Sequence, residues 1–226
     1  MAFFAGAVTS IVSGYIGMIV AVKANAKVCL ACRDSLSKGF VVAFRAGSVM
    51  GFCLCSLGLL VLLTLLICYI SMYKDIDYID GVDEATKERL FDNWKGMFES
   101  IAGFGLGGSS ISLFGRVGGG IYTKAADVGA DLVVKVEEDL PEDSPKNPGT
   151  IADNVGDNVG DVAGMGADLF GSFAESTSAT LVVGSTVKTF WMECTGAVYF
   201  PVAICAFGIV ACLVGVFVWA CKVDCT

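Results

Sequence analysis

The sequence predicts an all-α fold, a polytopic membrane helix bundle with about five transmembrane helices. Composition is the first reason: 55% of the 226 residues are hydrophobic and 17% are charged, whereas a soluble domain is typically about half apolar and a quarter charged. The second reason is a series of long runs without charge, because a helix needs roughly 20 such residues to cross a bilayer. Both features argue against a soluble globular enzyme.

The expected spans follow one another along the chain. Three are uncharged, and the first is too long to be a signal peptide and has no basic segment before it. The other two carry charged residues on one side. A proline cluster separates these two, so we expect a loop at 136–150 and then a helix that has Thr150 as its N-cap. The spans are expected near 2–22, 46–73, 100–135, 151–187 and 194–221.

The charge of the connecting loops predicts the orientation in the membrane. The first loop contains five basic residues and a single acid, and by the positive-inside rule it is cytosolic. The next loop, 74–92, is rich in acids and is expected on the far side. The loop at 136–150 then returns to the cytosol. The basic residues of the first loop are Lys23, Lys27, Arg33, Lys38 and Arg45.

Several other functions are disfavoured by the residue inventory. The chain has no His, which excludes catalysis or metal binding by His, and its net charge of −8 makes nucleic-acid binding unlikely. Cys29 and Cys32 have the spacing of a metal or redox pair, but no second pair follows at zinc spacing. The glycines at 105–108 superficially suggest a phosphate loop, but close helix packing explains small residues in a membrane helix better.

The acids of the fourth span predict an ion pathway. At about 100° per residue, its five acids share one stripe that runs about 33 Å along a continuous helix. A carboxylate inside the membrane must be paired or protonated, and Arg116 in the preceding span is the obvious partner. A structural ion pair is the alternative reading. The five acids are Asp153, Asp157, Asp161, Asp168 and Glu175.

A second group of charges predicts a phosphate site at the cytosolic end. Asp127 and Asp131 lie near Lys124 on the third span, and the first three acids of the fourth span join them. Crowded carboxylates protonate or bind a cation, and oxygen ligands favour Mg²⁺, which prefers one or two carboxylates plus phosphate oxygens. The residues alone therefore predict a magnesium–phosphate site above an ion path.

Four segments resemble the motifs of membrane-integral inorganic pyrophosphatases of the proton-translocating, vacuolar type. They are YTKAADVGADLVVKVE at 122–137, IADNVGDNVGD at 151–161, AGMGADLF at 163–170 and AEST at 174–177. The resemblance implies that pyrophosphate hydrolysis drives ion pumping, with an H⁺-exporting diphosphatase activity. It further implies Mg²⁺ as cofactor, K⁺ as an optional activator, and a homodimer in membrane lipid.

The resemblance also implies roles for individual residues. Asp127, Asp131 and Asp157 are expected to hold Mg²⁺, and Lys124 is expected to bind the substrate. Asp161 is expected to activate the attacking water and to contribute to the metal site. Further acids with less defined roles are Glu142, Asp143 and Asp153, and the ion gate is expected to consist of Arg116, Asp168 and Glu175.

The position of the gate glutamate indicates the pumped ion. Sodium-pumping members of the family place it three residues after the Asp168 position, where this chain has Gly171. Here the glutamate is Glu175, as in the proton pumps, and we therefore expect H⁺. The catalytic side should be cytosolic, in a vacuolar or acidocalcisomal membrane if the source is eukaryotic.

The resemblance covers only an internal part of the family fold. Its members have about sixteen helices, and this chain resembles a portion near the third to seventh of them, as one partial domain over 1–226. Further Mg²⁺ ligands, substrate lysines and the second water-positioning aspartate are expected in the remainder, so we expect no turnover by this chain alone. The alternatives are a catalytically silent fragment and a non-enzymatic cation transporter.

Overall fold

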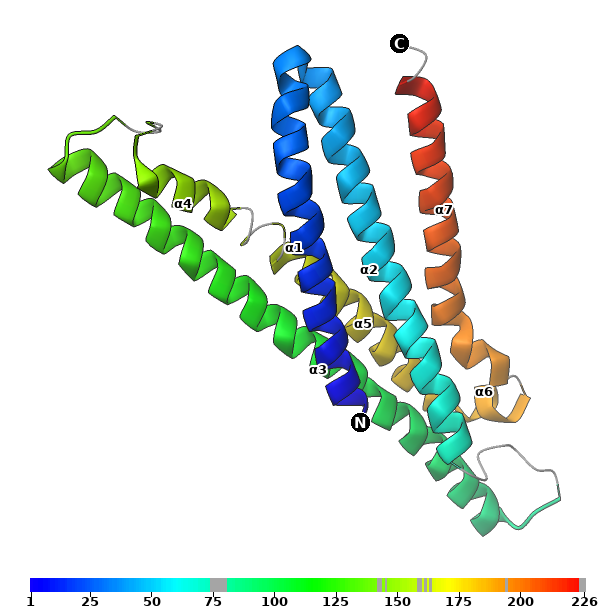
Figure 1. Cartoon of the computed structure of the whole chain (residues 1–226). Helices are drawn as coiled ribbons and strands as arrows, with labels where there is room; N and C mark the ends of the chain where they lie inside the picture. Colours follow the sequence, from blue (N-terminus) through cyan, green and yellow to red (C-terminus); the bar gives the residue numbers. More distant parts are fainter. Residues whose placement is uncertain are drawn as a thin grey trace. The chain divides into compact units, whose positions relative to one another are not determined.

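A computed structural model describes residues 1–73, 81–141, 144, 146–157, 160, 162, 164–193 and 195–223. Every secondary-structure element in this part of the chain is helical, which confirms the all-α prediction (Figure 1). The elements are α1 (Ala2–Asp34), α2 (Leu36–Met72), α3 (Glu84–Gly129), the π-helix η1 (Ala130–Glu137), α4 (Pro148–Asp157), α5 (Gly164–Ser185), α6 (Lys188–Glu193), the 3₁₀ helix η3 (Thr195–Tyr199) and α7 (Phe200–Val223).

Three helical segments in the described residues are long and apolar enough to cross a membrane. They are Ala2–Asp34, Leu36–Met72 and Gly196–Ala220, and they overlap the three uncharged runs of the sequence. The basic loop predicted between the first two spans was wrong, because α1 and α2 extend through it and only Ser35 lies between them. The third predicted span, 100–135, lies within α3 and η1, which together are helical from Glu84 to Glu137. Membrane crossing by this stretch and by the fourth predicted span stays a prediction.

The fourth predicted span differs from the structure. The sequence predicted one continuous helix over 151–187, whereas α4 ends at Asp157 and α5 begins at Gly164. Gly160 and Val162, between the two, have π-helical hydrogen bonding, which changes the rotation per residue. The single helical stripe from Asp153 to Glu175 was therefore wrong, because a constant angle of 100° per residue does not extend across this interval.

The start of α4 also differs from the prediction. Asn147, not Thr150, is the N-cap: its side-chain oxygen accepts a hydrogen bond from the backbone N–H of Gly149 at 2.8 Å. Pro148 is the first helical residue, a position where proline is favoured because no hydrogen bond from its nitrogen is needed. Asn147 is 2% exposed, so this cap is buried with the site described below.

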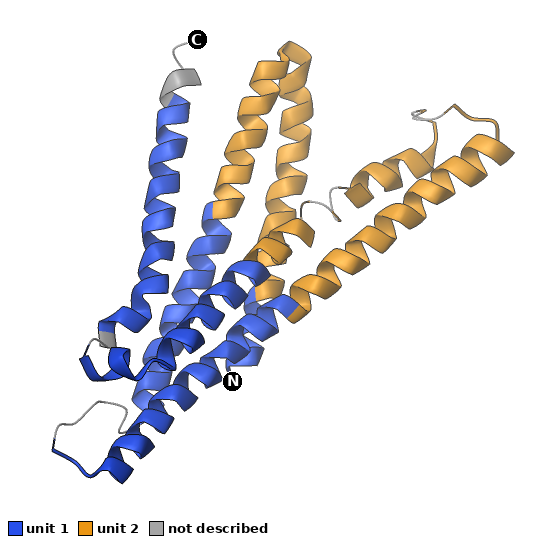
Figure 2. Ribbon diagram, turned by 180° about the vertical axis from the view of Figure 1, so that it is seen from behind, with its two compact units in different colours: residues 1–9, 52–109, 171–226 blue, residues 10–51, 110–170 orange. Residues whose placement is uncertain are grey.

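The chain divides into two compact units (Figure 2). Unit 1 contains residues 1–9, 52–109 and 171–226, and unit 2 contains residues 10–51 and 110–170.

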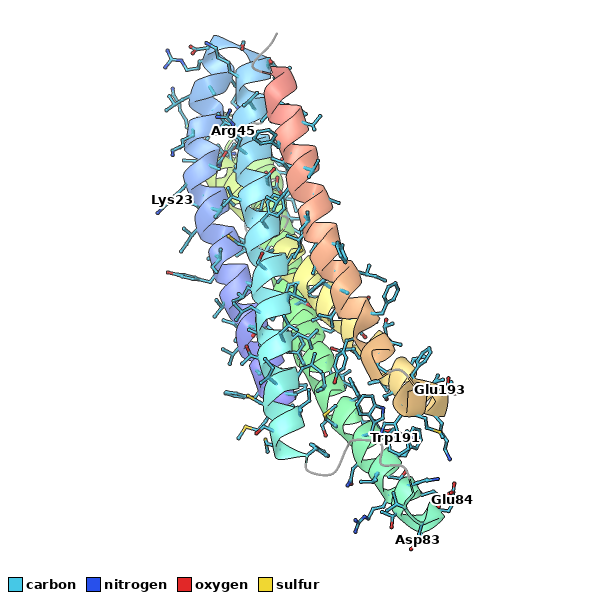
Figure 3. All side chains as sticks on the ribbon, turned by 90° about the vertical axis from the view of Figure 1, so that its right-hand side faces the viewer. Lys23, Arg45, Asp83, Glu84, Trp191 and Glu193 are labelled. Atoms are coloured by element: carbon cyan, nitrogen blue, oxygen red, sulfur yellow. The ribbon has the colours of Figure 1, made fainter. Side chains whose placement is uncertain are left out.

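Unit 1 has an aromatic core. The ring centroids of Trp94 and Phe98 are 4.9 Å apart, and Phe98 lies 6.0 Å from Tyr199. At one end of the unit, Trp191 packs 5.5 Å from Phe91. Figure 3 shows Asp83, Glu84 and Glu193 at this same end. Trp rings beside charged groups are typical of a membrane interface.

Close helix packing in unit 1 depends on glycine. A Cβ on Gly107 would overlap the carbonyl oxygen of Phe3, and one on Gly6 would overlap the carbonyl oxygen of Phe104. A Cβ on Gly105 would lie 2.8 Å from the Cα of Glu175. These contacts join α3 to α1 and to α5, and they confirm that the glycines of this segment serve helix packing. The same segment is regular helix, so it does not form a phosphate loop.

Within unit 2, α1 and α2 form a tight hairpin. Ser35 separates the two helices, and its hydroxyl oxygen accepts a hydrogen bond from the backbone N–H of Lys38 at 3.2 Å. Cys29 and Cys32 are free and exposed near this turn. Lys23 and Arg45, labelled in Figure 3, are exposed on the same hairpin.

Candidate functional site

The candidate site lies in unit 2, where α4 and the residues after it pack against α3 and η1. Four glycines form the contact, and glycines with higher residue numbers face residues with lower numbers on the other segment. Gly149 faces Ala130, Gly156 and Gly160 face Thr123, and Gly164 faces Arg116. The two segments are therefore antiparallel. The approach is close because hypothetical Cβ atoms on these glycines would lie only 2.8–3.2 Å from the nearest atoms of the facing residues.

This antiparallel alignment brings the acids of the two segments together. The partly buried position of Asp153 and the negative charges of Asp127 and Asp157 raise the pKa of the Asp153 carboxyl above its ordinary value. The charge of Asp131 acts in the same direction, and that of Lys124 opposes it. Asp153 lies outside the three candidate membrane spans. Four predicted site acids thus share one electrostatic environment, although they come from two segments.

The arrangement fits a cation that is shared with a substrate. In the described residues, no group of three or more carboxylate or thiolate side chains is close enough to hold a metal ion by itself. Mg²⁺ does not need such a cage, because it is commonly bound by one or two carboxylates together with phosphate oxygens and water. Asp127, Asp131 and Asp157 offer the oxygen ligands that it prefers. The predicted residues Asp161, Glu142 and Asp143 lie outside the described residues.

A cavity of about 270 Å³ opens between the same two segments. It contains two positive side chains, Arg116 and Lys124, and one carboxylate, Asp157. Such a mixture suits a small anion that carries a cation with it. The Lys124 ammonium also lies 3.4 Å from the carboxylate of Asp127, so it connects the cavity to the acidic group. The lining residues are Arg116, Gly120, Thr123, Lys124, Asp157, Gly160 and Met165.

Arg116 and Asp168 form an ion pair, with 3.0 Å between Nη1 of Arg116 and Oδ2 of Asp168. The prediction that Arg116 pairs with an acid of the fourth predicted span is confirmed for Asp168. Both side chains remain about half exposed, at 51% and 44%, so the pair is open to further partners or water. Because Arg116 also lines the cavity, the pair adjoins the candidate phosphate site. Glu175, the third predicted gate residue, belongs to unit 1, where it packs on Gly105.

Sequence reasoning missed the residues that hold the two segments together. Gly149, Gly156, Gly160 and Gly164 were not singled out, and neither was Thr123. The spacing of seven, four and four residues among these glycines is a repeated small-xxx-small pattern, which indicates close helix contact. That signal could have identified the contacting face, but not the residue on which it packs.

Comparison with known proteins identifies the family. The chain matches the family described as "Inorganic H+ pyrophosphatase" over residues 1–226. It is 44% identical over 217 residues to the "K(+)-insensitive pyrophosphate-energized proton pump 2" of Moorella thermoacetica. It is 49% identical over 214 residues to the "Putative K(+)-stimulated pyrophosphate-energized sodium pump" of Clostridium tetani. A third relative, the "Pyrophosphate-energized membrane proton pump 3" of Arabidopsis thaliana, is 40% identical over 217 residues.

These alignments cover 95–96% of the chain but only 26–29% of each relative. The chain therefore spans less than a third of the length of the relatives it matches. Their names include both proton and sodium pumps and both K⁺-stimulated and K⁺-insensitive forms, so the ion is not decided by similarity. The motifs, the helical architecture and the match over the whole chain lead to one conclusion: this chain belongs to the inorganic H⁺ pyrophosphatase family of membrane-integral, pyrophosphate-energised ion pumps.

Proposed function

We propose that this chain provides part of a magnesium-dependent pyrophosphate hydrolysis site on the cytosolic side of the membrane, and the first part of the H⁺ path beneath it. The observation that carries this proposal is the cavity between α3 and α4. Its lining places the cations Arg116 and Lys124 opposite Asp157, next to the acidic group and to the Arg116–Asp168 pair. Anion binding and ion transfer thereby share Arg116.

The chemistry follows from the charges. Lys124 binds the oxygens of the substrate, and Asp127, Asp131 and Asp157 hold the cation that accompanies it. Magnesium, when bound, neutralises phosphate charge and polarises the bridging P–O bond. Asp161 accepts a proton from the attacking water, whose oxygen bonds to one phosphorus as the bridging bond breaks. The bridging oxygen leaves with the second phosphate, so the products are one phosphate that carries the hydroxyl from water, one phosphate that carries the bridging oxygen, and the proton held on Asp161.

The proposed ion is H⁺. Asp168 is held by Arg116 at 3.0 Å, and a proton arriving from the site would weaken this pair by neutralising the carboxylate. Glu175 would be the next acceptor along the path, and Gly171 occupies the place where sodium-pumping relatives carry the glutamate. We further propose that K⁺ activates the complete pump and that the complete pump is a homodimer. This chain crosses a vacuolar, acidocalcisomal or bacterial membrane five times in the proposal.

The test uses the chain in two forms. In the first, membranes contain only these 226 residues. In the second, a hybrid pump, the chain replaces the matching segment of the Moorella thermoacetica proton pump, to which it is 44% identical. We expect Mg²⁺-dependent phosphate release from pyrophosphate by the hybrid pump and none by the chain alone.

Lys124→Ala should lower hydrolysis by the hybrid about 10- to 100-fold, since a charged hydrogen bond to substrate contributes about 1.5–3 kcal/mol. Lys38→Ala is the matched control, because Lys38 is an exposed lysine on the α1–α2 hairpin that pairs with Asp34 at 3.5 Å. Full activity of the hybrid with Lys124→Ala would contradict the proposed site. Pyrophosphate-independent ion flux would favour the transporter alternative, and an inactive but folded hybrid would favour a silent fragment.

A further inference from the structure

One side chain of α3 is enclosed by two glycines of the facing segment. Thr123 is 8% exposed. A Cβ on Gly160 would lie 2.8 Å from the Thr123 hydroxyl oxygen, and a Cβ on Gly156 would lie 3.1 Å from the Thr123 Cα and 3.3 Å from the same hydroxyl oxygen. Thr123 therefore occupies the space that the missing side chains of Gly156 and Gly160 leave open.

Thr123 has little freedom to adapt. Its hydroxyl donates a hydrogen bond to the carbonyl oxygen of Gly119 at 3.0 Å. A threonine in a helix is confined to two preferred χ1 rotamers, so this side chain cannot turn freely away from Gly160. Any added atom on Gly160 must consequently move one segment away from the other.

The enclosed threonine is surrounded by the groups proposed to bind substrate. Lys124 is its neighbour in sequence, Asp157 follows Gly156, and both side chains line the same cavity. The contact of Gly160 with Thr123 thus fixes the distance across the cavity between α3, which carries Lys124, and the facing segment, which carries Asp157.

We infer that Thr123, seated between Gly156 and Gly160, is a positioning residue that sets the width of the pyrophosphate cavity. This inference rests on the proposed function, because it holds that Thr123 sets the distance between the two substrate-site residues Lys124 and Asp157. It adds a specific contact that the charged residues alone do not reveal.

The magnitude follows from the geometry. Contact at 2.8 Å is 0.6 Å short of the 3.4 Å at which ordinary van der Waals contact begins. Since a misplacement of about 1 Å can cost about 100-fold in activity, a shift of this size should raise the KM for magnesium pyrophosphate about tenfold. The amount of folded pump does not affect KM, so a defect in folding alone would leave it unchanged.

The experiment measures KM and kcat for magnesium pyrophosphate in variants of the hybrid pump. Gly160→Ala should raise KM about tenfold. Adding Thr123→Ala to Gly160→Ala removes both γ atoms and should return KM to the value of Thr123→Ala alone. Adding Thr123→Val instead keeps two γ atoms and should not restore KM. Gly118→Ala is the matched control, because a Cβ on this α3 glycine meets no atom within 4 Å.

A second variant, Gly156→Ala, keeps the inference testable if Gly160→Ala does not fold. Gly156→Ala meets the backbone of Thr123 at the longer distance of 3.1 Å, so its rise in KM should be smaller and Thr123→Ala should restore it only in part. An unchanged KM in both glycine variants would overturn the inference, as would equal rescue by Thr123→Ala and Thr123→Val. Either result would leave the proposed function standing if Lys124→Ala still lowers hydrolysis as predicted above, so the two failures are distinguishable.

Discussion

The contact between Gly105 and Glu175 in unit 1 gives a sharp prediction about coupling. Glu175 is the proposed second carrier of the H⁺ path, and its backbone packs directly on Gly105 of α3. We expect Gly105→Ala to displace Glu175 without touching the hydrolysis site. Pumping should therefore suffer more than pyrophosphate hydrolysis.

The size of the displacement can be estimated from three contacts. A Cβ on Gly105 would lie 2.8 Å from the Cα of Glu175, 3.2 Å from the carbonyl oxygen of Ala174 and 3.3 Å from the Glu175 nitrogen. All three are backbone atoms, which cannot rotate away, so α5 must move by at least 0.6 Å to reach ordinary contact at 3.4 Å. Overpacking of this kind destabilises a fold by about 1–3 kcal/mol.

The local packing resists such a movement. Ala174 and Leu181 on α5 are 0% exposed, and the Thr177 hydroxyl lies 3.7 Å from the sulfur of Cys205 on α7. Because α5 is packed on both sides within unit 1, the strain should appear as a shifted or tilted helix around Glu175.

The assay is proton uptake into vesicles that contain the hybrid pump, measured together with phosphate release. For Gly105→Ala we expect hydrolysis within about threefold of the unmodified hybrid and a fall of at least about twofold in protons moved per pyrophosphate, the size of effect expected when a positioned group shifts by a fraction of an ångström. Gly118→Ala, on the same helix but in open space, should leave the ratio unchanged. A normal ratio for Gly105→Ala, or an equal fall for Gly118→Ala, would refute the reasoning.

Three further predictions concern the acids. Glu175→Gln should lower proton transport per pyrophosphate more than it changes the KM for magnesium pyrophosphate; an unchanged ratio of transport to hydrolysis would exclude Glu175 from the path. Asp161→Asn should abolish hydrolysis by the hybrid while magnesium pyrophosphate still binds, as measured by calorimetry; near-normal hydrolysis would remove Asp161 from the catalytic role. The pKa of Asp153 is raised by its partial burial and then by the charges of Asp127 and Asp157. At pH values above that pKa, the ionised carboxylate therefore destabilises the folded chain. Protonation below about pH 4 removes this destabilisation. Asp153→Asn should therefore raise the Tm of the chain at pH 7 and leave it unchanged at pH 3, and a lower Tm at pH 7 would contradict this account.

Several elements could be predicted because the signal is local. The uncharged runs that form parts of α1, α2 and α7 are recognisable from composition, since the cost of placing charge in lipid selects against charged residues at each position separately. The glycines near Gly105 and Gly107 were correctly assigned to helix packing for a similar reason. Small residues at this spacing in a helix indicate close packing without knowledge of the partner.

Other elements could not be predicted because they depend on contacts. The prediction that Asp153 and Glu175 lie on one helical stripe assumed an unbroken helix. In the structure, α4 ends at Asp157, so the assumption does not hold. Thr150 was chosen as the N-cap from residue type alone, whereas Asn147 fills this role because it is buried with its side-chain oxygen directed at the N–H of Gly149. Helix ends depend on the surrounding packing as well as on local preference.

By itself, the sequence determined the helical membrane architecture, the acidic and basic residue set, and the motifs that identify the family. Hydrophobicity, charge and motif spacing are properties of the chain that need no folding to be read. Only the tertiary structure decided which of these residues meet: that Arg116 pairs with Asp168, that Asp153 shares its environment with Asp127, and that Thr123 is enclosed by Gly160. The physical reason is that these contacts depend on the antiparallel register of two segments, which is set by side-chain volume at their interface and not by the preferences of either segment alone.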